Sequence, residues 1–249
     1  MTGVIDQQSL IEDQQASTKH DTNGKGEPIE LESEQKKWIR GDRQASDWLA
    51  EEIRPIFIHD RGADAFAFYR EVTDKLDAGF VIRANQNRCI QTPSGTDGRL
   101  IDWSEDLPEQ GRTSIEIEQG SGREAREAEL IVKASSCELL PPKNDPTHTE
   151  PVEVNVVRID ELGEQDDPIQ WVLLTPESVA AFNDSLSVLE SYRARWTIED
   201  WHKVLKTGCR IEERRLETWE RMEVLLSVYS VIAWKVLELR ELARGDTHY

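Results

Sequence analysis

A short apolar run that ends in an acid places the strongest limit on the fold of this chain. Residues 54–59 (RPIFIH) precede Asp60, and a continuous run of β-branched and aromatic residues is typical of a strand buried in a parallel sheet. Residues 65–78 then predict a helix, and residues 79–83 (GFVIR) predict a second strand. The sequence therefore indicates an α/β fold with Asp60 at the carboxyl end of a strand, where open α/β sheets bind their ligands.

Asp60 has a second interpretation, as the N-cap of the helix that follows it, because aspartate is a favoured capping residue. Four residues later, Asp64 is expected to be an acid in the first turn of that helix rather than a ligand, since the helix dipole stabilises negative charge there.

The two ends of the chain are expected to be mostly helical. Residues 3–10 predict one short strand, and residues 32–52 predict one or two helices. From residue 176 onward the sequence predicts helix, with long helices at residues 190–207 and 217–244. The last helix has apolar residues at helical spacing, which predicts core packing. These residues are Val224, Leu225, Val228, Val231, Ile232, Val236 and Leu239.

The middle of the chain, residues 85–175, has a different character. Apolar and polar residues alternate strictly at residues 114–118 and 151–156, and a period of two is typical of half-buried strands. Further strands are expected at residues 129–134 and 170–174, with Gly and Pro clusters between them. This region is therefore predicted to be a β-rich insertion.

Five polar residues near the C-terminal third share one stripe of a predicted helix. They are Tyr192, Arg195, Glu199, Lys203 and Lys206. With steps of 3, 4, 4 and 3, at about 100° per residue, they stay within roughly 80° of each other. A carboxylate can hold a divalent cation and the cations can hold phosphates, which favours phosphodiester chemistry. The alternative is an ordinary i,i+4 ion pair between Glu199 and Lys203 on a solvated helix.

The charge balance is strongly acidic, with 49 acidic and 30 basic side chains and a net charge of −19. Residues 192–215 differ, because seven basic minus four acidic residues leave a net charge of +3. A surface adapted to very high salt around a basic nucleic-acid site would give this pattern, and we infer a halophilic source. The alternative explanation of the acidity is solubility alone.

Several classes of protein are disfavoured. The sequence contains no run of about 18–20 apolar residues for a membrane span and no signal peptide. Cys89, Cys137 and Cys209 fit neither a disulfide framework nor a zinc site. A cytoplasmic protein without a membrane partner is therefore expected.

The order Y-x2-R-x3-E-x6-K, from Tyr192 to Lys206, resembles the signature of the cut-and-paste DDE transposases typified by transposon Tn-five, the insertion-sequence-four group. The surrounding text, YRARWTIEDWHKVLKTGCRIEERRL, and the HDRGAD segment at residues 59–64 are similar to that family. The resemblance implies a partial ribonuclease-H-like core in residues 1–84, a β-rich insertion in residues 85–175, and helices in residues 176–249 that complete the core.

The resemblance also implies a reaction and its residues. Such enzymes hydrolyse and join phosphodiesters at transposon ends with two divalent ions, here Mg²⁺ or Mn²⁺. It assigns the second and third catalytic carboxylates, both metal ligands, to Asp60 and Glu199. The residues implied to contact DNA are Arg83, Trp171, Tyr192, Arg195, Lys203 and Lys206. For Trp171 the alternative is an ordinary buried tryptophan of a sheet.

The first catalytic aspartate of the family has no match here. Residues 3–10 (GVIDQQSL) resemble a later strand of the family's first three, so Asp6 is a poor substitute. We therefore expect a fragment of a longer transposase that is inactive alone. The alternative is a non-catalytic remnant that binds DNA or a full-length partner, and a homodimer is a further option. An unrelated ribonuclease-H-like nuclease is disfavoured by the Tyr-Arg-Glu-Lys spacing.

Overall fold

The computed structural model describes residues 34–50, 52–117, 125–143 and 148–244. The predicted strand at residues 3–10, with Asp6, lies outside these residues. The chain divides into a larger unit, residues 49–195, and a smaller unit made of residues 1–48 and 196–249. Both helices and strands are present, so the predicted mixed α/β class is confirmed.

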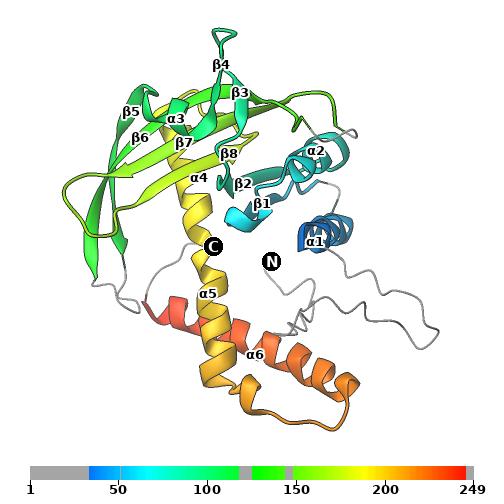
Figure 1. Cartoon of the computed structure of the whole chain (residues 1–249). Coiled ribbons are helices and arrows are strands. Elements are labelled where there is room, and N and C mark those ends of the chain that lie inside the picture. The colour runs from blue at the N-terminus through cyan, green and yellow to red at the C-terminus, as the bar shows by residue number, and fades with distance from the viewer. Residues whose placement is uncertain (1–33, 51, 118–124, 144–147, 245–249) are drawn as a thin grey trace. The chain divides into compact units, whose positions relative to one another are not determined.

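A single sheet of eight strands forms the larger unit, within the described residues (Figure 1). Its order is β1-β2-β8-β7-β6-β3-β4, and β5 pairs with β6. The pair β1 and β2 is parallel, whereas the other pairs are antiparallel. The strands are β1 (Ile56–His59), β2 (Gly79–Arg83), β3 (Cys89–Gln91), β4 (Asp97–Arg99), β5 (Glu109–Ile117), β6 (Arg126–Leu139), β7 (Val152–Glu161) and β8 (Gln170–Thr175).

The strand–helix–strand unit predicted around Asp60 is present. β1 leads through a 3₁₀ turn, η1 (Arg61–Ala63), into helix α2 (Phe66–Lys75) and then into β2. Ile56 pairs with Gly79 and His59 with Ile82. Phe80 and Ile82 of β2 are fully buried, as the continuous apolar run GFVI requires of a strand covered on both faces.

The predicted β-rich strands continue the same sheet as β1 and β2. β8 pairs with β2 on one side and with β7 on the other. The sheet therefore passes through the predicted domain boundary at residue 84. The sequence did not indicate the short strands β3 and β4 or helix α3 (Leu100–Glu105), because each is only three to six residues long.

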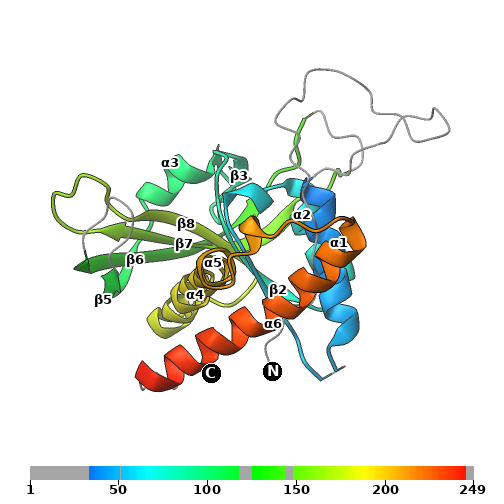
Figure 2. The same cartoon turned by 90° about the horizontal axis from the view of Figure 1, so that it is seen from below.

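Two helices cover opposite faces of the sheet in the larger unit. Helix α4 (Phe182–Ala194) crosses one face and α3 lies against the other (Figure 2). The alternation of β8 explains this arrangement, because successive side chains point to opposite faces. Trp171 of β8 contacts Tyr192 of α4, whereas the next residue, Val172, pairs with Arg158, which donates to Ser104 of α3.

The smaller unit is helical where it is described. It contains α1 (Glu34–Trp48), α5 (Trp196–Lys203), a π turn η2 (Val204–Gly208), a 3₁₀ turn η3 (Ile211–Glu213) and α6 (Trp219–Arg244). Its core joins α5, η2 and α6 through Trp201, Leu205, Ala233 and Leu237. The indole of Trp201 also donates a hydrogen bond of 3.1 Å to the Ser230 carbonyl.

Two sequence predictions about these helices are wrong. The single helix expected over residues 190–207 is interrupted at Arg195 and widens into the π turn at Val204. The apolar residues expected in the core on α6 are mostly exposed, while Ala233 and Leu237 are buried on the opposite side. Helical spacing locates apolar faces but does not say which face is covered. The exposed residues are Val224, Val228, Val231, Ile232, Val236 and Leu239.

Among the described residues, no helix is both long enough and apolar enough to cross a membrane.

Candidate nucleic-acid and metal site

Asp60 and Arg83 lie side by side where β1 and β2 end. His59 pairs with Ile82 in the parallel register, so the following residues, Asp60 and Arg83, come next to each other. Neighbouring strands lie about 4.8 Å apart. The Arg83 guanidinium donates to the Gln170 carbonyl and forms no ion pair with Asp60.

Asp60 caps the turn η1 rather than helix α2. Its Oδ1 accepts a hydrogen bond of 2.9 Å from the Gly62 amide, so the capping interpretation is correct for the 3₁₀ turn only. The side chain is exposed, and within the described part of the chain Oδ2 accepts no hydrogen bond. The capping bond fixes the carboxylate while one oxygen stays open to a metal ion or to water.

Aromatic rings and guanidinium groups alternate beside this edge. Arg83 Cζ lies 6.0 Å from the centre of the Trp171 ring, which meets the Tyr192 ring edge-on at 5.1 Å. Arg195 Cζ lies 5.9 Å from the centre of the Tyr192 ring. Arg83 Nη2 also donates to the Gln170 carbonyl at 3.1 Å. These contacts bring four of the predicted site residues together at the ends of β2 and α4 and the start of β8.

Both aromatic residues of this group are buried, Trp171 at 6% and Tyr192 at 3% exposed. In this conformation Trp171 is a sheet tryptophan, and a cation above an aromatic face is attracted by the negative potential of the ring. The rings therefore support the two arginines here. The DNA contact that the resemblance implies for Trp171 remains a prediction.

The electrostatics of this edge are positive. Burial lowers the pKa of Arg83, and the neighbouring cations Arg61 and Arg195 lower it further, against the raising effect of Tyr192. The side chains of Arg61 and Arg83 form no ion pair with any described residue. In a chain with 49 acidic side chains, these three neighbouring arginines form a locally positive group.

In the smaller unit, α5 and the start of η2 have both packed and exposed side chains. Asp200 accepts from Arg240 of α6, and Val204 packs against the core of this unit. Glu199 and Lys203 are exposed.

The other charged groups of this helix are partly engaged. Lys206 lies in the π turn and pairs with Glu212 at 3.2 Å. Burial lowers the pKa of His202, although the negative charge of Glu199 raises it. Single π turns occur often at functional sites, and this one displaces Lys206 from the ideal stripe.

The comparison with known families agrees with this geometry. The family model described as a transposase DDE domain matches residues 40–234. This chain belongs to the DDE transposase family. DNA transposition is thus the reaction of its family, whose members act on DNA and generally use divalent metal ions.

The metal site of this transposase domain is incomplete among the described residues. Asp60 lies in the larger unit and Glu199 in the smaller one, so their sharing of one ion remains a prediction. The described parts of the chain hold no group of three or more His, Cys, Asp or Glu residues arranged to bind a metal. Carboxylates are the ligands that Mg²⁺ and Mn²⁺ prefer, so Asp60 and Glu199 suit the ion chemically, but two acids alone do not make a two-ion site.

Asp64 of the transposase domain is not the first-turn acid that the sequence predicted. It precedes α2, whose N-cap is Ala65, and its side chain is fully buried. Its carboxylate accepts hydrogen bonds from the segment after β2. The sequence carried no sign of this role, because its partner Arg88 lies 24 residues away.

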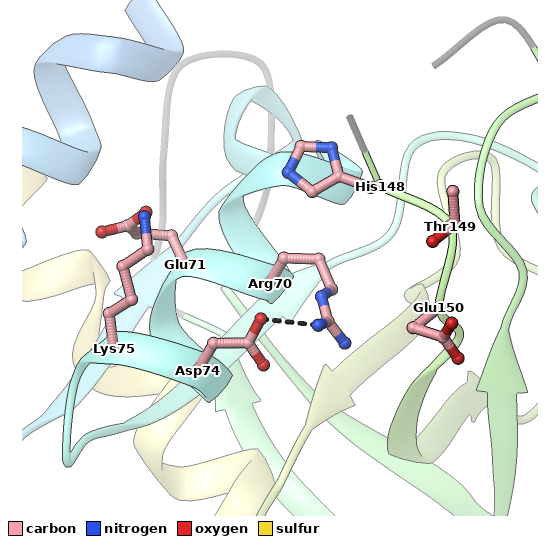
Figure 3. Close-up of a pocket in the computed structure, with 7 residues that line it drawn as sticks. All are labelled: Arg70, Glu71, Asp74, Lys75, His148, Thr149 and Glu150. Carbon is pink, nitrogen blue, oxygen red and sulfur yellow. Dashed lines mark hydrogen bonds and ion pairs between the residues drawn. The ribbon is translucent and has the colours of Figure 1, made fainter. Parts of the chain in front are cut away.

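A separate pocket on the larger unit offers no second site. Its basic groups already have partners, since Arg70 pairs with Asp74 at 2.7 Å and Lys75 with Glu71 at 2.9 Å (Figure 3). No predicted site residue lines this pocket. The lining residues are Arg70, Glu71, Asp74, Lys75, His148, Thr149 and Glu150.

Proposed function

We propose that this chain is the catalytic part of a cut-and-paste DNA transposase of the Tn-five-like, insertion-sequence-four group, acting in the cytoplasm. The observation that carries the proposal is the edge where Asp60 lies next to Arg83, with Arg61 and Arg195 close to it. A carboxylate beside a group of neighbouring arginines suits a phosphodiester and its metal ion.

The cations would hold the DNA backbone. Each phosphate that a protein neutralises releases condensed counterions, so binding weakens as salt rises. Arg83 and Arg195 contribute from the larger unit, and Lys203 and Lys206 from the smaller. Guanidinium groups bind phosphate through two parallel hydrogen bonds, which favours the two arginines as the groups that orient the strand.

Asp60 and Glu199 would hold the metal ions. Asp60 has an open oxygen fixed in place by the bond from Gly62, and Glu199 lies on the exposed face of α5. Mg²⁺ or Mn²⁺ supplies activation of the attacking oxygen and stabilisation of the leaving oxygen. The parallel β1–α2–β2 unit supports a ribonuclease-H-like core around these acids.

A third carboxylate would lie on a strand that pairs with the outer edge of β1. Strand β1 ends the sheet, and its outer edge pairs with no described strand. A strand added there would lie about 4.8 Å from β1, and an acid at its end would be next to Asp60. We propose that this acid comes from a second polypeptide and that the chain alone does not cleave transposon ends.

The second candidate is a non-catalytic remnant that binds DNA, a full-length transposase or a second copy of itself. The observation that favours it is the absence of a complete carboxylate cluster among the described residues. The two candidates share the DNA-binding edge and differ only in chemistry.

An end-cleavage assay with Mg²⁺ or Mn²⁺, at high and low salt, separates them. The purified chain is expected to bind DNA without cleaving it. Cleavage that appears when a polypeptide carrying the family's first aspartate strand is added, and disappears with Glu199→Gln, supports the split active site. Cleavage by the chain alone contradicts the missing-acid account, and no cleavage in either mixture leaves the remnant as the function.

A further inference from the structure

Asp64 is a buried acid that the proposed chemistry does not use. It lies between η1 and α2, four residues after Asp60, and its side chain is 0% exposed. A carboxylate at such a position needs partners for its oxygens, because an unpaired buried charge is strongly disfavoured. The hydrogen-bond donors of the Asp64 carboxylate therefore show which segments it joins.

Two segments of the larger unit meet at this carboxylate. Oδ2 accepts from the amides of Asn85 and Gln86, both at 2.7 Å. Oδ1 accepts from Arg88 Nε at 2.7 Å and from the Tyr69 hydroxyl at 2.9 Å. An ionised carboxylate accepts about four hydrogen bonds, so these four occupy it and leave no site for a metal ion.

The segments joined in this way follow the two strands of the site. Asp64 continues from β1 through η1, in which its amide donates to the Arg61 carbonyl and the Gly62 amide donates to Asp60 Oδ1. The amides that donate to Asp64 belong to Asn85 and Gln86, and Asn85 is two residues after Arg83. The Ala84 amide, between Arg83 and Asn85, donates a hydrogen bond to the Val172 carbonyl of β8. One carboxylate thus joins the turn that begins at Asp60 to the segment that follows Arg83 at the end of β2.

We infer that Asp64 is a positioning residue, which sets the placement of the Asp60 carboxylate relative to the Arg83 guanidinium. The inference rests on the proposed function for its DNA readout and on the hydrogen-bond network for its structural readout. Small misplacements matter at such a site, since an error of about 1 Å can reduce a rate about 100-fold.

Glu161 provides a matched control. It is also a buried acid, with its side chain 1% exposed, and it accepts from Arg126 at 2.8 and 2.9 Å and from the Ile169 amide at 2.9 Å. It belongs to the end of β7, and these three hydrogen bonds join β7 to Arg126 and Ile169. Glu161→Gln therefore weakens a similar buried network that does not include Asp64 or its hydrogen-bond donors.

The experiment compares Asp64→Asn with Glu161→Gln in the full chain, well below both melting temperatures. Hydrogen exchange is measured at residues 56–66 and 79–88, and duplex DNA binding is measured with and without Arg83→Ala. Asp64→Asn is expected to speed exchange in both segments and to weaken DNA binding about tenfold, within the range of couplings inside one hydrogen-bonded network. Arg83→Ala should then add little, whereas it should keep its full effect beside Glu161→Gln.

Two results would overturn the inference: exchange at both segments unchanged by Asp64→Asn, or an undiminished effect of Arg83→Ala in that variant. Failure of the proposed function gives a different outcome. If the native chain binds no duplex DNA, the DNA-binding proposal is wrong. The hydrogen-exchange measurement then tests the positioning role of Asp64 by itself. Faster exchange with Asp64→Asn but not with Glu161→Gln keeps the positioning role, and equal exchange removes it.

Discussion

At the scale of single residues, the sequence placed Asp60 correctly and Asp64 wrongly. Both acids stand in the segment HDRGAD, and local pattern could place Asp60 because a strand ends there. The role of Asp64 depends on the Asn85 and Gln86 amides and on the Arg88 side chain, which lie 21, 22 and 24 residues later. A local sequence pattern cannot predict such distant partners. The edge formed by Arg83, Trp171 and Tyr192 came from resemblance, and only the fold brings these residues together.

Replacement of Arg83 tests the phosphate-binding edge. Arg83→Ala is expected to weaken duplex DNA binding and to reduce the salt slope by about one unit, as the loss of one phosphate contact predicts. Arg112→Ala is the control, because Arg112 is an exposed arginine on β5 that pairs with Glu109. Titrations at several KCl concentrations measure both slopes, and equal slopes for the two variants would remove Arg83 from the interface.

At the scale of elements, the sequence predicted the βαβ unit and the last helix but missed short or irregular parts. Strands β3 and β4 are too short to show alternation. The π turn at Val204 cannot be distinguished from an α-helix by the spacing of its apolar residues. Helix α6 carries apolar residues on both sides, so its spacing alone could not distinguish the side that packs on α5 from the exposed side.

Two leucines of α6 test this assignment with the same substitution. Leu237 is 1% and Leu239 is 65% exposed. Leu237→Ala is expected to lower the free energy of unfolding by about 2–5 kcal/mol, as for other buried leucines. Leu239→Ala should stay within about 0.5 kcal/mol. Denaturant unfolding measures both, and equal losses would mean that the outer face of α6 is covered in solution and that the sequence prediction of core packing was right.

At the scale of the whole molecule, a net charge of −19 acts against compactness while the strand-end cluster stays positive. Self-repulsion among like charges destabilises a compact state, and salt screens it. The same salt competes with phosphate binding. Stability and DNA binding are therefore expected to respond to salt in opposite directions.

A KCl series tests this opposition. The melting temperature of the free chain should rise with KCl, while its affinity for duplex DNA falls. Thermal unfolding and binding titrations in the same buffers measure the two trends. A melting temperature that stays constant or falls would contradict the charge-repulsion account and the inferred halophilic adaptation.

The central proposal is that the Asp60 and Glu199 carboxylates bind the same metal ions. Its most direct test is Mn²⁺ affinity, measured by calorimetry on the DNA-bound chain, for Asp60→Asn, Glu199→Gln and the double variant, with Asp200→Asn as the control that pairs with Arg240. The account predicts about a tenfold loss for each single change, no further loss for the double variant, and native affinity for Asp200→Asn. Losses that add independently, or affinity unchanged by either substitution, would contradict a shared site.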